Sequence, residues 1–270
     1  MRIEYSVRSH VGWVRENNED NFAVNGATLP ANLGNRPFFL DGIAEYPAVF
    51  AVCDGMGGED DGEIASRLAA NTVLQFEDEI CHAGKKKLNK IVQDCVREAD
   101  AAIRVSVGRW RQSGTTLAMA VINRQGAFCF NLGDSRIYAL CGKNLHRVSH
   151  EHTWFAEHIR DADQIPKRRG KLYKLTGCLG IGEHRDAEAY PPIKGKYRIL
   201  LCSDGLTDRI SGEEIREILD SCAGTDKAAD ALLSLALDKG GHDNITIIVA
   251  DGRTTFPAFT GRGARGGKRT

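Results

Sequence analysis

Four aspartates in this chain stand next to or close to a glycine at one end of an apolar run. They are Asp54, Asp134, Asp204 and Asp243, with glycine at positions 55, 133, 205 and 241. The ends of strands are rigid, and glycine lets the backbone bend sharply and approach a ligand closely. A single Asp-Gly pair is typical of a hairpin turn. Because the pattern recurs in separate segments, it favours carboxylates that converge on one point.

Converging carboxylates repel one another, since unit charges about 4 Å apart interact by several kcal/mol at a moderate dielectric constant. A bound divalent cation removes this repulsion. A ligand set made of carboxylates suits Mg²⁺ or Mn²⁺ rather than Zn²⁺. We therefore expect a magnesium or manganese site, and a metal-free protein that is looser around it.

The acids need strands to hold them, and the apolar pattern predicts these strands in consecutive groups. The expected strands cover residues 2–9, 20–25, 38–40, 48–53, 114–122, 126–132, 136–140, 197–203 and 244–250. Helices are expected near 64–80, 88–102, 153–160, 211–221 and 226–239, the first two from apolar residues at helical spacing. Strands in runs, with helices in pairs, favour an α+β fold with antiparallel sheet and helices packed outside.

The chain contains no repeat and no linker, so the sequence predicts one domain over residues 1–252. Glycine and proline interrupt residues 26–47, which we expect to be an irregular insertion. Residues 161–174 are expected to form a polar, basic loop. Residues 253–270 are rich in glycine and arginine and are expected to be a disordered basic tail.

The composition excludes several classes of protein. The 270 residues contain 36 Lys and Arg against 36 Asp and Glu, which is unlike a basic nucleic-acid-binding protein or an acidic disordered chain. The eight cysteines form no Cys-x-x-Cys pair, which favours buried, reduced thiols. The sequence has neither a signal peptide nor an apolar run long enough to span a bilayer. We expect a cytoplasmic protein that binds no membrane and no nucleic acid.

Six motifs, in order along the chain, carry a resemblance to a known family. They are Arg15-Glu16-Asn17-Asn18-Glu19-Asp20, Asp54-Gly55-Met56-Gly57-Gly58, Ser113-Gly114-Thr115-Thr116, Gly133-Asp134-Ser135-Arg136, Ser203-Asp204-Gly205-Leu206-Thr207-Asp208 and Gly241-His242-Asp243-Asn244-Ile245-Thr246. Together they resemble the metal-dependent protein phosphatase family, the protein phosphatase 2C type, in its bacterial form. Each motif alone is weakly specific, but six in this order between about residue 8 and residue 251 are specific.

The resemblance implies a fold and a metal centre. The fold is a central antiparallel β-sandwich flanked by pairs of α-helices, in four layers (αββα). Asp54 would bridge two Mn²⁺ or Mg²⁺ ions, and the Gly55 carbonyl would bind the second. Asp204 and Asp243 would complete the first ion. Asp134, with Asp204, would hold a third ion.

The resemblance also implies an activity, the hydrolysis of phosphoserine and phosphothreonine in proteins by a metal-activated water. The implied catalytic residues are Arg15, which would bind the phosphate, and Glu19 and Asp20, which would act mainly through metal-bound waters. Residues 161–174 would correspond to the mobile flap of the family. The implied partners are phosphorylated proteins, either one regulatory target or many, and a Ser/Thr kinase. The protein is expected to be a monomer.

The alternative hypothesis is a pseudophosphatase that binds phosphoproteins or acts as a scaffold for a Ser/Thr kinase. That hypothesis predicts the loss of a metal-binding acid, whereas Asp54, Asp204 and Asp243 are all present. A further alternative is nucleic-acid binding through the basic tail, which predicts salt-sensitive binding that is lost on truncation after Asp251.

Several polar side chains in or near the motifs could have either a catalytic or a structural role. Serine and threonine hydroxyls could be nucleophiles and histidines could be proton donors, although packing and structural roles are favoured for all of them: Ser113, Thr115, Thr116, His10, His150, His152 and His242. Asp208 could be a ligand, although a helix cap or a solvated acid is favoured. Met56 stands where other members have a histidine proposed as the general acid, and Glu151 where the family usually has aspartate.

Overall fold

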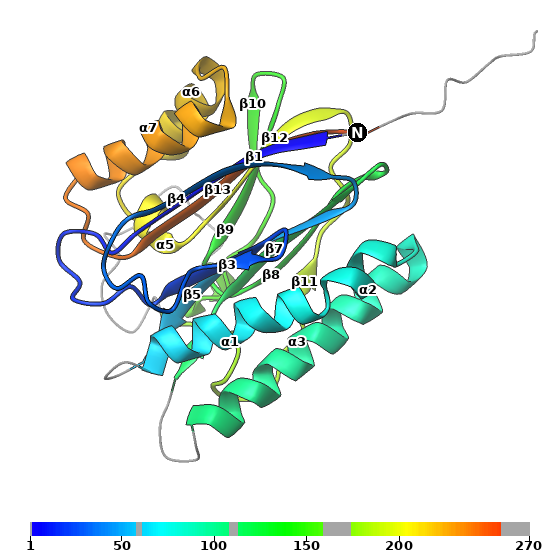
Figure 1. The fold of residues 1–270 in the computed structure, drawn as a ribbon, viewed down its shortest axis with the longest axis vertical. Coiled ribbons are helices and arrows are strands. Elements are labelled where there is room, and N and C mark those ends of the chain that lie inside the picture. The colour runs from blue at the N-terminus through cyan, green and yellow to red at the C-terminus, as the bar shows by residue number, and fades with distance from the viewer. Residues whose placement is uncertain (1, 58–60, 108–112, 159–173, 255–270) are drawn as a thin grey trace, which may run out of the picture.

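The protein is described by a computed structural model over residues 2–57, 61–107, 113–158 and 174–254. In this part of the chain the strands form two antiparallel sheets (Figure 1). Sheet A has the order β10 (Asn144–Arg147), β9 (Arg136–Cys141), β12 (Lys196–Cys202), β13 (Ile245–Arg253), β1 (Arg2–His10) and β4 (Phe38–Glu45). Sheet B has the order β11 (Glu188–Ala189), β8 (Gly126–Leu132), β7 (Leu117–Asn123), β5 (Ala48–Met56), β2 (Asp20–Val24) and β3 (Ala27–Thr28), with β6 (Gly114–Thr115) paired to β5.

The last strand of the chain lies in the middle of sheet A. β13 pairs with β1 on one side, from Glu4 opposite Asp251 to His10 opposite Ile245, and with β12 on the other. Residues 245–250 are buried throughout, as expected for a continuous apolar run with neighbours on both sides and packing on both faces. Sheet A therefore depends on contacts between strands from opposite ends of the sequence.

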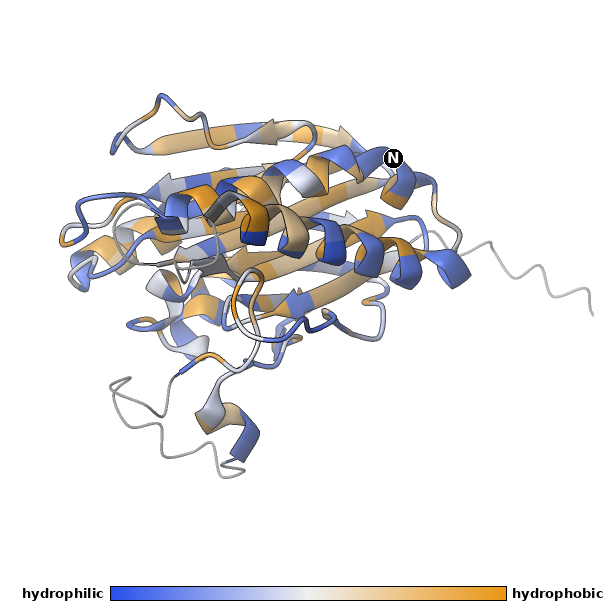
Figure 2. Cartoon of the chain, turned by 90° about the horizontal axis from the view of Figure 1, so that it is seen from below, coloured by the Kyte–Doolittle hydropathy of each residue, from blue (hydrophilic) through white to orange (hydrophobic). Residues whose placement is uncertain are grey.

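Helices cover the outer faces of both sheets. α1 (Asp61–Gln75), α2 (Glu77–His82) and α3 (Lys85–Val107) pack on sheet B, and α6 (Gly212–Ser221) and α7 (Thr225–Asp238) pack on sheet A (Figure 1). A third apolar cluster fills the space between the sheets. The strands are hydrophobic along most of their length, whereas the helices carry polar and apolar residues together (Figure 2). This arrangement confirms the predicted antiparallel sandwich with paired helices outside.

Two short helices complete the described elements. α4 (Trp154–His158) precedes residues 159–173, and α5 (Asp204–Thr207) follows β12 directly. The helix expected over 64–80 is two helices, α1 and α2, with Phe76 between them. No helix in the described ranges is long and apolar enough to cross a membrane.

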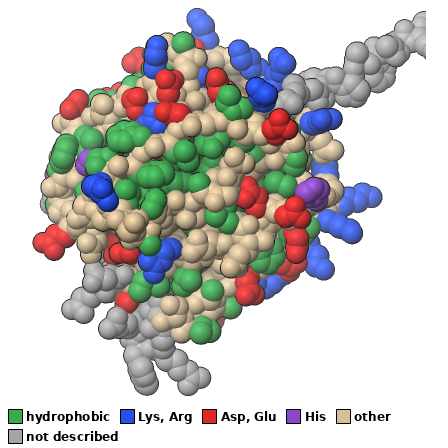
Figure 3. All heavy atoms as spheres, viewed as in Figure 1, with side chains coloured by type: hydrophobic (Ala, Val, Ile, Leu, Met, Phe, Trp, Pro, Cys, Tyr) green, Lys and Arg blue, Asp and Glu red, His purple; other side chains and the backbone are tan. Residues whose placement is uncertain are grey.

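Residues 26–47 are more regular than predicted, because the strand expected over 38–40 continues to Glu45. β4 is an eight-residue edge strand that pairs with β1 along its whole length. Its Phe39 and Ile43 side chains are exposed. Figure 3 shows apolar side chains gathered on the face of the molecule that is seen in Figure 1. β4 is therefore an edge strand of sheet A, next to β1.

The other predicted segments lie largely outside the described residues. The basic loop 161–174 is outside them except for Lys174, and the tail 253–270 is outside them except for Arg253 and Thr254. Arg253 is still part of β13, and the Thr254 N–H donates to the Gly195 carbonyl at 2.9 Å. The folded domain therefore extends past the predicted boundary at residue 252 by two residues.

Candidate metal centre

Two of the acids lie opposite each other on neighbouring strands of sheet B. Asp20 at the start of β2 is the register partner of Asp54 in β5. The backbone of Asp54 is held by a threonine in the connection between β6 and β7: the Asp54 N–H donates to Thr116 Oγ1 at 3.0 Å, and the Thr116 N–H donates to the Asp54 carbonyl at 2.9 Å. Cross-strand pairing therefore fixes both carboxylates on one side of the sandwich.

Two more acids reach the same point from other elements. Asp134 lies in the turn between β8 of sheet B and β9 of sheet A, and Asp204 is the first residue of α5 after β12. One carboxylate oxygen from each of Asp54, Asp134 and Asp204 lies within 4.8 Å of the other two. Gly205 lies against the loop before β13, because a Cβ there would be 2.0 Å from the Asn244 carbonyl oxygen. The glycine beside Asp204 thus permits close approach between the start of α5 and the loop that carries Asp243 and Asn244.

The fifth acid, Asp243, contacts the arginine predicted to bind phosphate. Arg15 Nη2 donates to Asp243 Oδ2 at 2.8 Å, and the Asn244 N–H donates to Asp243 Oδ1 at 2.9 Å. The contact with Asp243 raises the pKa of Arg15 further above its ordinary value. Arg15 is half exposed, so the guanidinium lies where the acid cluster opens to solvent.

Glu19 and Gly55 lie against the first turn of α1. The Gly55 N–H donates to the Glu19 carbonyl at 3.1 Å. A Cβ on Gly62 would be 2.7 Å from Glu19 Oε1, so this carboxylate lies at the helix N-terminus, which favours negative charge. A Cβ on Gly55 would be 2.2 Å from the Gly62 carbonyl oxygen. Only glycine fits at position 55, between the backbone of Glu19 and that of Gly62.

Burial and the repulsion between neighbouring carboxylates govern the pKa values of Asp54 and Asp20. Burial, and then the charge of Asp20, Asp204, Asp134 and Asp243, raises the pKa of Asp54 well above its usual value. Burial also raises the pKa of Asp20 to about 7, against the lowering effect of a hydrogen bond from Ser203. These acids hold their protons unusually tightly, so their ionised forms require a positive charge nearby.

The residues present fit a hard divalent cation. Asp20 is 1% exposed, and among the described residues its Oδ1 has no hydrogen-bond partner, while its Oδ2 accepts from Ser203 Oγ at 2.7 Å. A buried carboxylate oxygen without a partner is costly unless a cation or an ordered water compensates it. An all-oxygen set built from aspartates is the chemistry that Mg²⁺ and Mn²⁺ prefer.

Three further polar residues hold the acids in place. Sequence reasoning assigned no role to Ser203 or Asn244, and favoured a structural role for His152 without naming a partner. Ser203 donates to Asp20, as described above. Asn244 joins the two loops of the site: its Oδ1 accepts from the Glu19 N–H at 2.8 Å, and its Nδ2 donates to the carbonyls of Val11 and Asn17 at 2.9 Å each. Ser203 precedes Asp204 and Asn244 follows Asp243. Their positions next to predicted metal ligands were the only indication of this role in the sequence.

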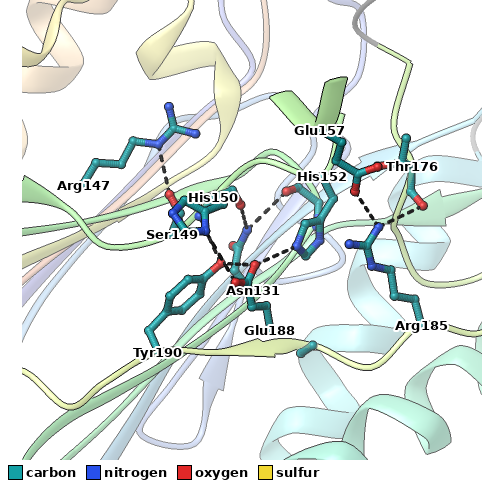
Figure 4. A network of polar contacts seen from close by, with 12 residues as sticks. Asn131, Arg147, Ser149, His150, His152, Glu157, Thr176, Arg185, Glu188 and Tyr190 are labelled. Atoms are coloured by element: carbon teal, nitrogen blue, oxygen red, sulfur yellow. Dashed lines mark hydrogen bonds and ion pairs between the residues drawn. The ribbon is translucent and has the colours of Figure 1, made fainter. Parts of the chain in front are cut away.

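The third supporting residue is His152, at the base of the segment that leads to residue 159 (Figure 4). Its Nδ1 accepts from the Gly133 N–H at 3.1 Å, and its backbone N–H donates to the Gly133 carbonyl at 2.9 Å. Its Nε2 lies 3.3 Å from Glu188 Oε2, which also accepts from Tyr190 OH at 2.7 Å. This network fixes the glycine that precedes Asp134.

The side chains that could have either role make structural contacts. Ser113 Oγ donates to the Asp61 carbonyl at 2.6 Å, and Thr115 Oγ1 donates to the Asp54 carbonyl at 3.0 Å. His10 Nδ1 accepts from the Gly12 N–H at 2.8 Å. Glu151 is buried, and its Oε1 accepts from Arg136 Nε at 2.5 Å. Its longer side chain thus serves local packing.

Comparisons with known proteins agree with this geometry. The family model for protein phosphatase 2C matches residues 41–236. A serine/threonine phosphatase stp from Listeria monocytogenes serovar 1/2a is 28% identical over 268 residues, which cover 93% of this chain and 96% of that protein. The serine/threonine protein phosphatase PstP from Mycobacterium tuberculosis H37Rv is 31% identical over 92% of this chain and 45% of its own length.

A solved structure extends the likeness to three dimensions. The catalytic domain of the serine/threonine protein phosphatase PstP in complex with two manganese ions is 28% identical to this chain, with a TM-score of 0.74. The match covers 93% of this chain and 99% of that one. Sequence motifs, sandwich and acid cluster agree, and the chain belongs to the protein phosphatase 2C family in its bacterial form.

Proposed function

We propose that this protein is a Mn²⁺- or Mg²⁺-dependent phosphatase that hydrolyses phosphoserine and phosphothreonine in proteins. The observation that carries the proposal is the convergence of five aspartates from both sheets beside one half-exposed arginine. They are Asp20, Asp54, Asp134, Asp204 and Asp243, with Arg15 at the opening. The two relatives described above are serine/threonine phosphatases. The complete acid set favours an enzyme over a binding-only pseudophosphatase.

The acids divide between two core cations and a third. Asp54 would bridge the core pair, with the Gly55 carbonyl on one ion and Asp204 and Asp243 on the other. Asp134 and Asp204 would hold the third. The manganese-bound catalytic domain of PstP supports two core ions. The chemistry that such cations supply is a water of lowered pKa and neutralisation of charge on the phosphoryl oxygens.

The residues of the chain would bind and orient the substrate. The guanidinium of Arg15 can donate two hydrogen bonds to two phosphate oxygens, which fixes the phosphorus relative to the acids. Glu19 and Asp20 would orient waters around the cations through their carboxylate oxygens. Attack by a water on the phosphorus requires no covalent intermediate. The nearby hydroxyls are engaged in hydrogen bonds: Ser113 and Thr115 donate to backbone carbonyls, and Thr116 Oγ1 lies 2.7 Å from Ser135 Oγ.

Several broader features belong to the same proposal. The folded domain, which extends to residue 254, would be the catalytic domain. A Ser/Thr kinase would phosphorylate its substrates, and the protein would act as a monomer in the cytoplasm. All eight cysteines are free thiols, which is consistent with a reducing compartment.

Hydrolysis of an aryl phosphate, with and without Mn²⁺, tests the proposal. We expect activity that requires Mn²⁺ or Mg²⁺, is removed by a chelator and falls at least about 100-fold in Asp204→Asn, because that change removes a ligand of the cations. Asp220→Asn, at an exposed acid in α6, should match the wild type. A wild-type protein as inactive as Asp204→Asn would overturn the proposal.

A further inference from the structure

Two large apolar side chains are exposed next to the arginine of the metal centre. Trp13 and Val14 precede Arg15 in the loop that follows β1, and they are 66% and 60% exposed. Single exposed apolar residues are common on protein surfaces. These two are adjacent to each other and to the group proposed to bind phosphate, so they lie on the path of whatever chain carries that phosphate.

The Trp13 ring is held in place although most of it is exposed. Its Nε1–H donates to the Leu237 carbonyl at 3.2 Å, and its edge meets the His10 ring with centroids 5.1 Å apart. The ring also lies on the backbone of Gly241, since a Cβ there would be 2.8 Å from Trp13 Cδ1. A fixed aromatic surface loses little conformational entropy on binding, which is why tryptophan is frequent at binding hot spots.

The loop that carries these residues is joined to the metal centre. The Trp13 N–H donates to the Gly241 carbonyl at 2.7 Å, two residues before Asp243. Gly12 has φ +84°, and a Cβ there would be 2.4 Å from the Asp243 carbonyl oxygen. Figure 1 shows this loop, in dark blue after β1, beside the orange turn that leads from α7 into β13. The loop that carries the apolar pair is therefore hydrogen-bonded to, and packed against, the loop that carries Asp243.

We propose that Trp13 and Val14 bind an apolar side chain of the phosphoprotein substrate, two to four residues from the phosphorylated serine or threonine. This rests on the proposed function, because it places the phosphate at Arg15. An extended chain rises about 3.5 Å per residue, and the Cα atoms of Trp13 and Arg15 are at most about 7 Å apart. A residue a few positions from the phosphate thus reaches the apolar pair.

The occupant is an apolar segment of substrate because Trp13 and Val14 directly precede Arg15. If Arg15 holds the phosphate, the peptide that carries it passes over Trp13 and Val14. An apolar side chain of that peptide would then be buried against them. Substrates with leucine or phenylalanine at these flanking positions should be preferred over those with serine. The preference concerns kcat/KM for peptides and has no counterpart in a small aryl phosphate.

Two phosphothreonine peptides test the proposal, one with leucine and one with serine at the second and third positions on both sides. We expect the wild type with Mn²⁺ to prefer the leucine peptide by about tenfold in kcat/KM. Trp13→Ala and Val14→Ser should reduce the ratio to about two or less. Val105→Ser, at an 84% exposed valine in α3, should leave the ratio at the wild-type value. Trp13→Phe should restore most of it.

The outcomes separate this inference from the proposed function. A wild type that fails to hydrolyse an aryl phosphate overturns the function, whereas one that hydrolyses it but shows a ratio near one overturns the inference alone. Val14→Ser keeps the test open if Trp13→Ala unfolds, because Val14 is largely exposed. Sedimentation at the assay concentration tests whether a second copy of the chain binds this surface instead. The proposal would be overturned if the wild type is a dimer, Trp13→Ala is a monomer and both show the same peptide ratio.

Discussion

At the scale of residues, Asp54 carries a strong electrostatic conflict. Its carboxylate is surrounded by four others, and its pKa is raised first by burial and then by those charges. A group whose pKa is raised in the folded state destabilises the protein as pH rises through that value, because the folded state must give up a proton it holds tightly. Asp54 therefore costs folding free energy in the absence of metal.

Replacing Asp54 by asparagine should reverse this cost. At pH 8 with a chelator, Asp54→Asn should unfold a few degrees above the wild type, since about 1 kcal/mol shifts Tm by about 2–4 °C in a domain of this size. The rise in Tm on adding Mn²⁺ should be largely lost. Thermal unfolding with and without Mn²⁺ measures both effects. Asp220→Asn is the control, and an Asp54→Asn protein that is less stable in chelator yet keeps the full Mn²⁺ response would contradict the argument.

His152 should make stability depend on pH near 6. Burial lowers its pKa, and Arg185 lowers it further, against the raising effects of Glu188 and Glu157. A histidine with a lowered pKa contributes fully above its unfolded pKa of about 6.5, and this contribution is lost as pH falls below it. Protonation would also end the acceptance of the Gly133 N–H by Nδ1.

We expect the unfolding free energy of the wild type to fall more steeply between pH 7 and pH 5 than that of His152→Asn. Asparagine keeps an oxygen acceptor for Gly133 but does not titrate. Urea unfolding of both proteins across this range, in chelator, gives the difference, which isolates the histidine from the acids. Equal slopes would show that His152 is not the titrating group.

At the scale of elements, a buried cation adds to the pairing that joins β4 to β1. Arg8 in β1 is 2% exposed, whereas its partners Asp41 in β4 and Asp230 in α7 are more than half exposed. Its guanidinium donates to them at 2.8 Å and 2.5 Å and lies 5.3 Å from the Phe39 ring centroid. Arg8 thus connects an inner strand, an edge strand and a covering helix.

Because Arg8 is buried and its two partners are exposed, removing the partners should destabilise the protein more than removing the arginine. Replacing both Asp41 and Asp230 by alanine leaves a buried unpaired cation and should cost about 3–5 kcal/mol. Arg8→Met removes the cation and leaves two acids that water can solvate, so it should cost less. Chemical denaturation of the two variants ranks them. The opposite order would mean that packing of the arginine stem, not the charge pair, dominates.

The difference between β4 and its prediction has a physical cause. Gly42 and the exposed apolar residues Phe39 and Ile43 break the pattern typical of a half-buried strand. Gly42 faces Tyr5 across the pair, and a Cβ would lie 2.5 Å from the tyrosine oxygen. The glycine that read as an interruption makes room for a ring on the neighbouring strand, and a single sequence does not reveal such a cross-strand need.

The same limit applies to the metal centre. Its acids could be predicted because each stands at the end of an apolar run, a local feature. Ser203 and Asn244 could not, because their partners Asp20 and Glu19 are 183 and 225 residues away. Hydrogen bonds between residues so far apart in the sequence depend on which strands are neighbours in a sheet. The sequence predicted that the sheets are antiparallel, but it did not predict the order of their strands.

At the scale of the whole molecule, the acid cluster links the two sheets. Asp20 and Asp54 come from sheet B, Asp204 and Asp243 adjoin strands of sheet A, and Asp134 lies between the sheets. Cations bound there hold both halves of the sandwich. Metal binding should therefore stabilise the molecule as a whole, beyond the loops around the site.

Hydrogen exchange with and without Mn²⁺ measures this effect. At a free concentration about 100 times Kd, binding should add about 2.7 kcal/mol to the unfolding free energy. The slowest-exchanging amides of β2 and β5 and of β12 and β13 should all gain protection together. Asp204→Asn should remove the gain in both sheets. Protection limited to one sheet would contradict the linkage.

The central place of β13 in sheet A has a consequence for synthesis of the protein. β1 is made first, but its partner on one side is the last strand, as is the partner of β12. A nascent chain that ends before residue 245 lacks β13, so sheet A is divided into β10-β9-β12 and β1-β4. It also lacks the strand that fixes the position of Asp243. The enzyme should therefore stay inactive on the ribosome until its last strand emerges, and folding should be slow, since contacts across such separations close late.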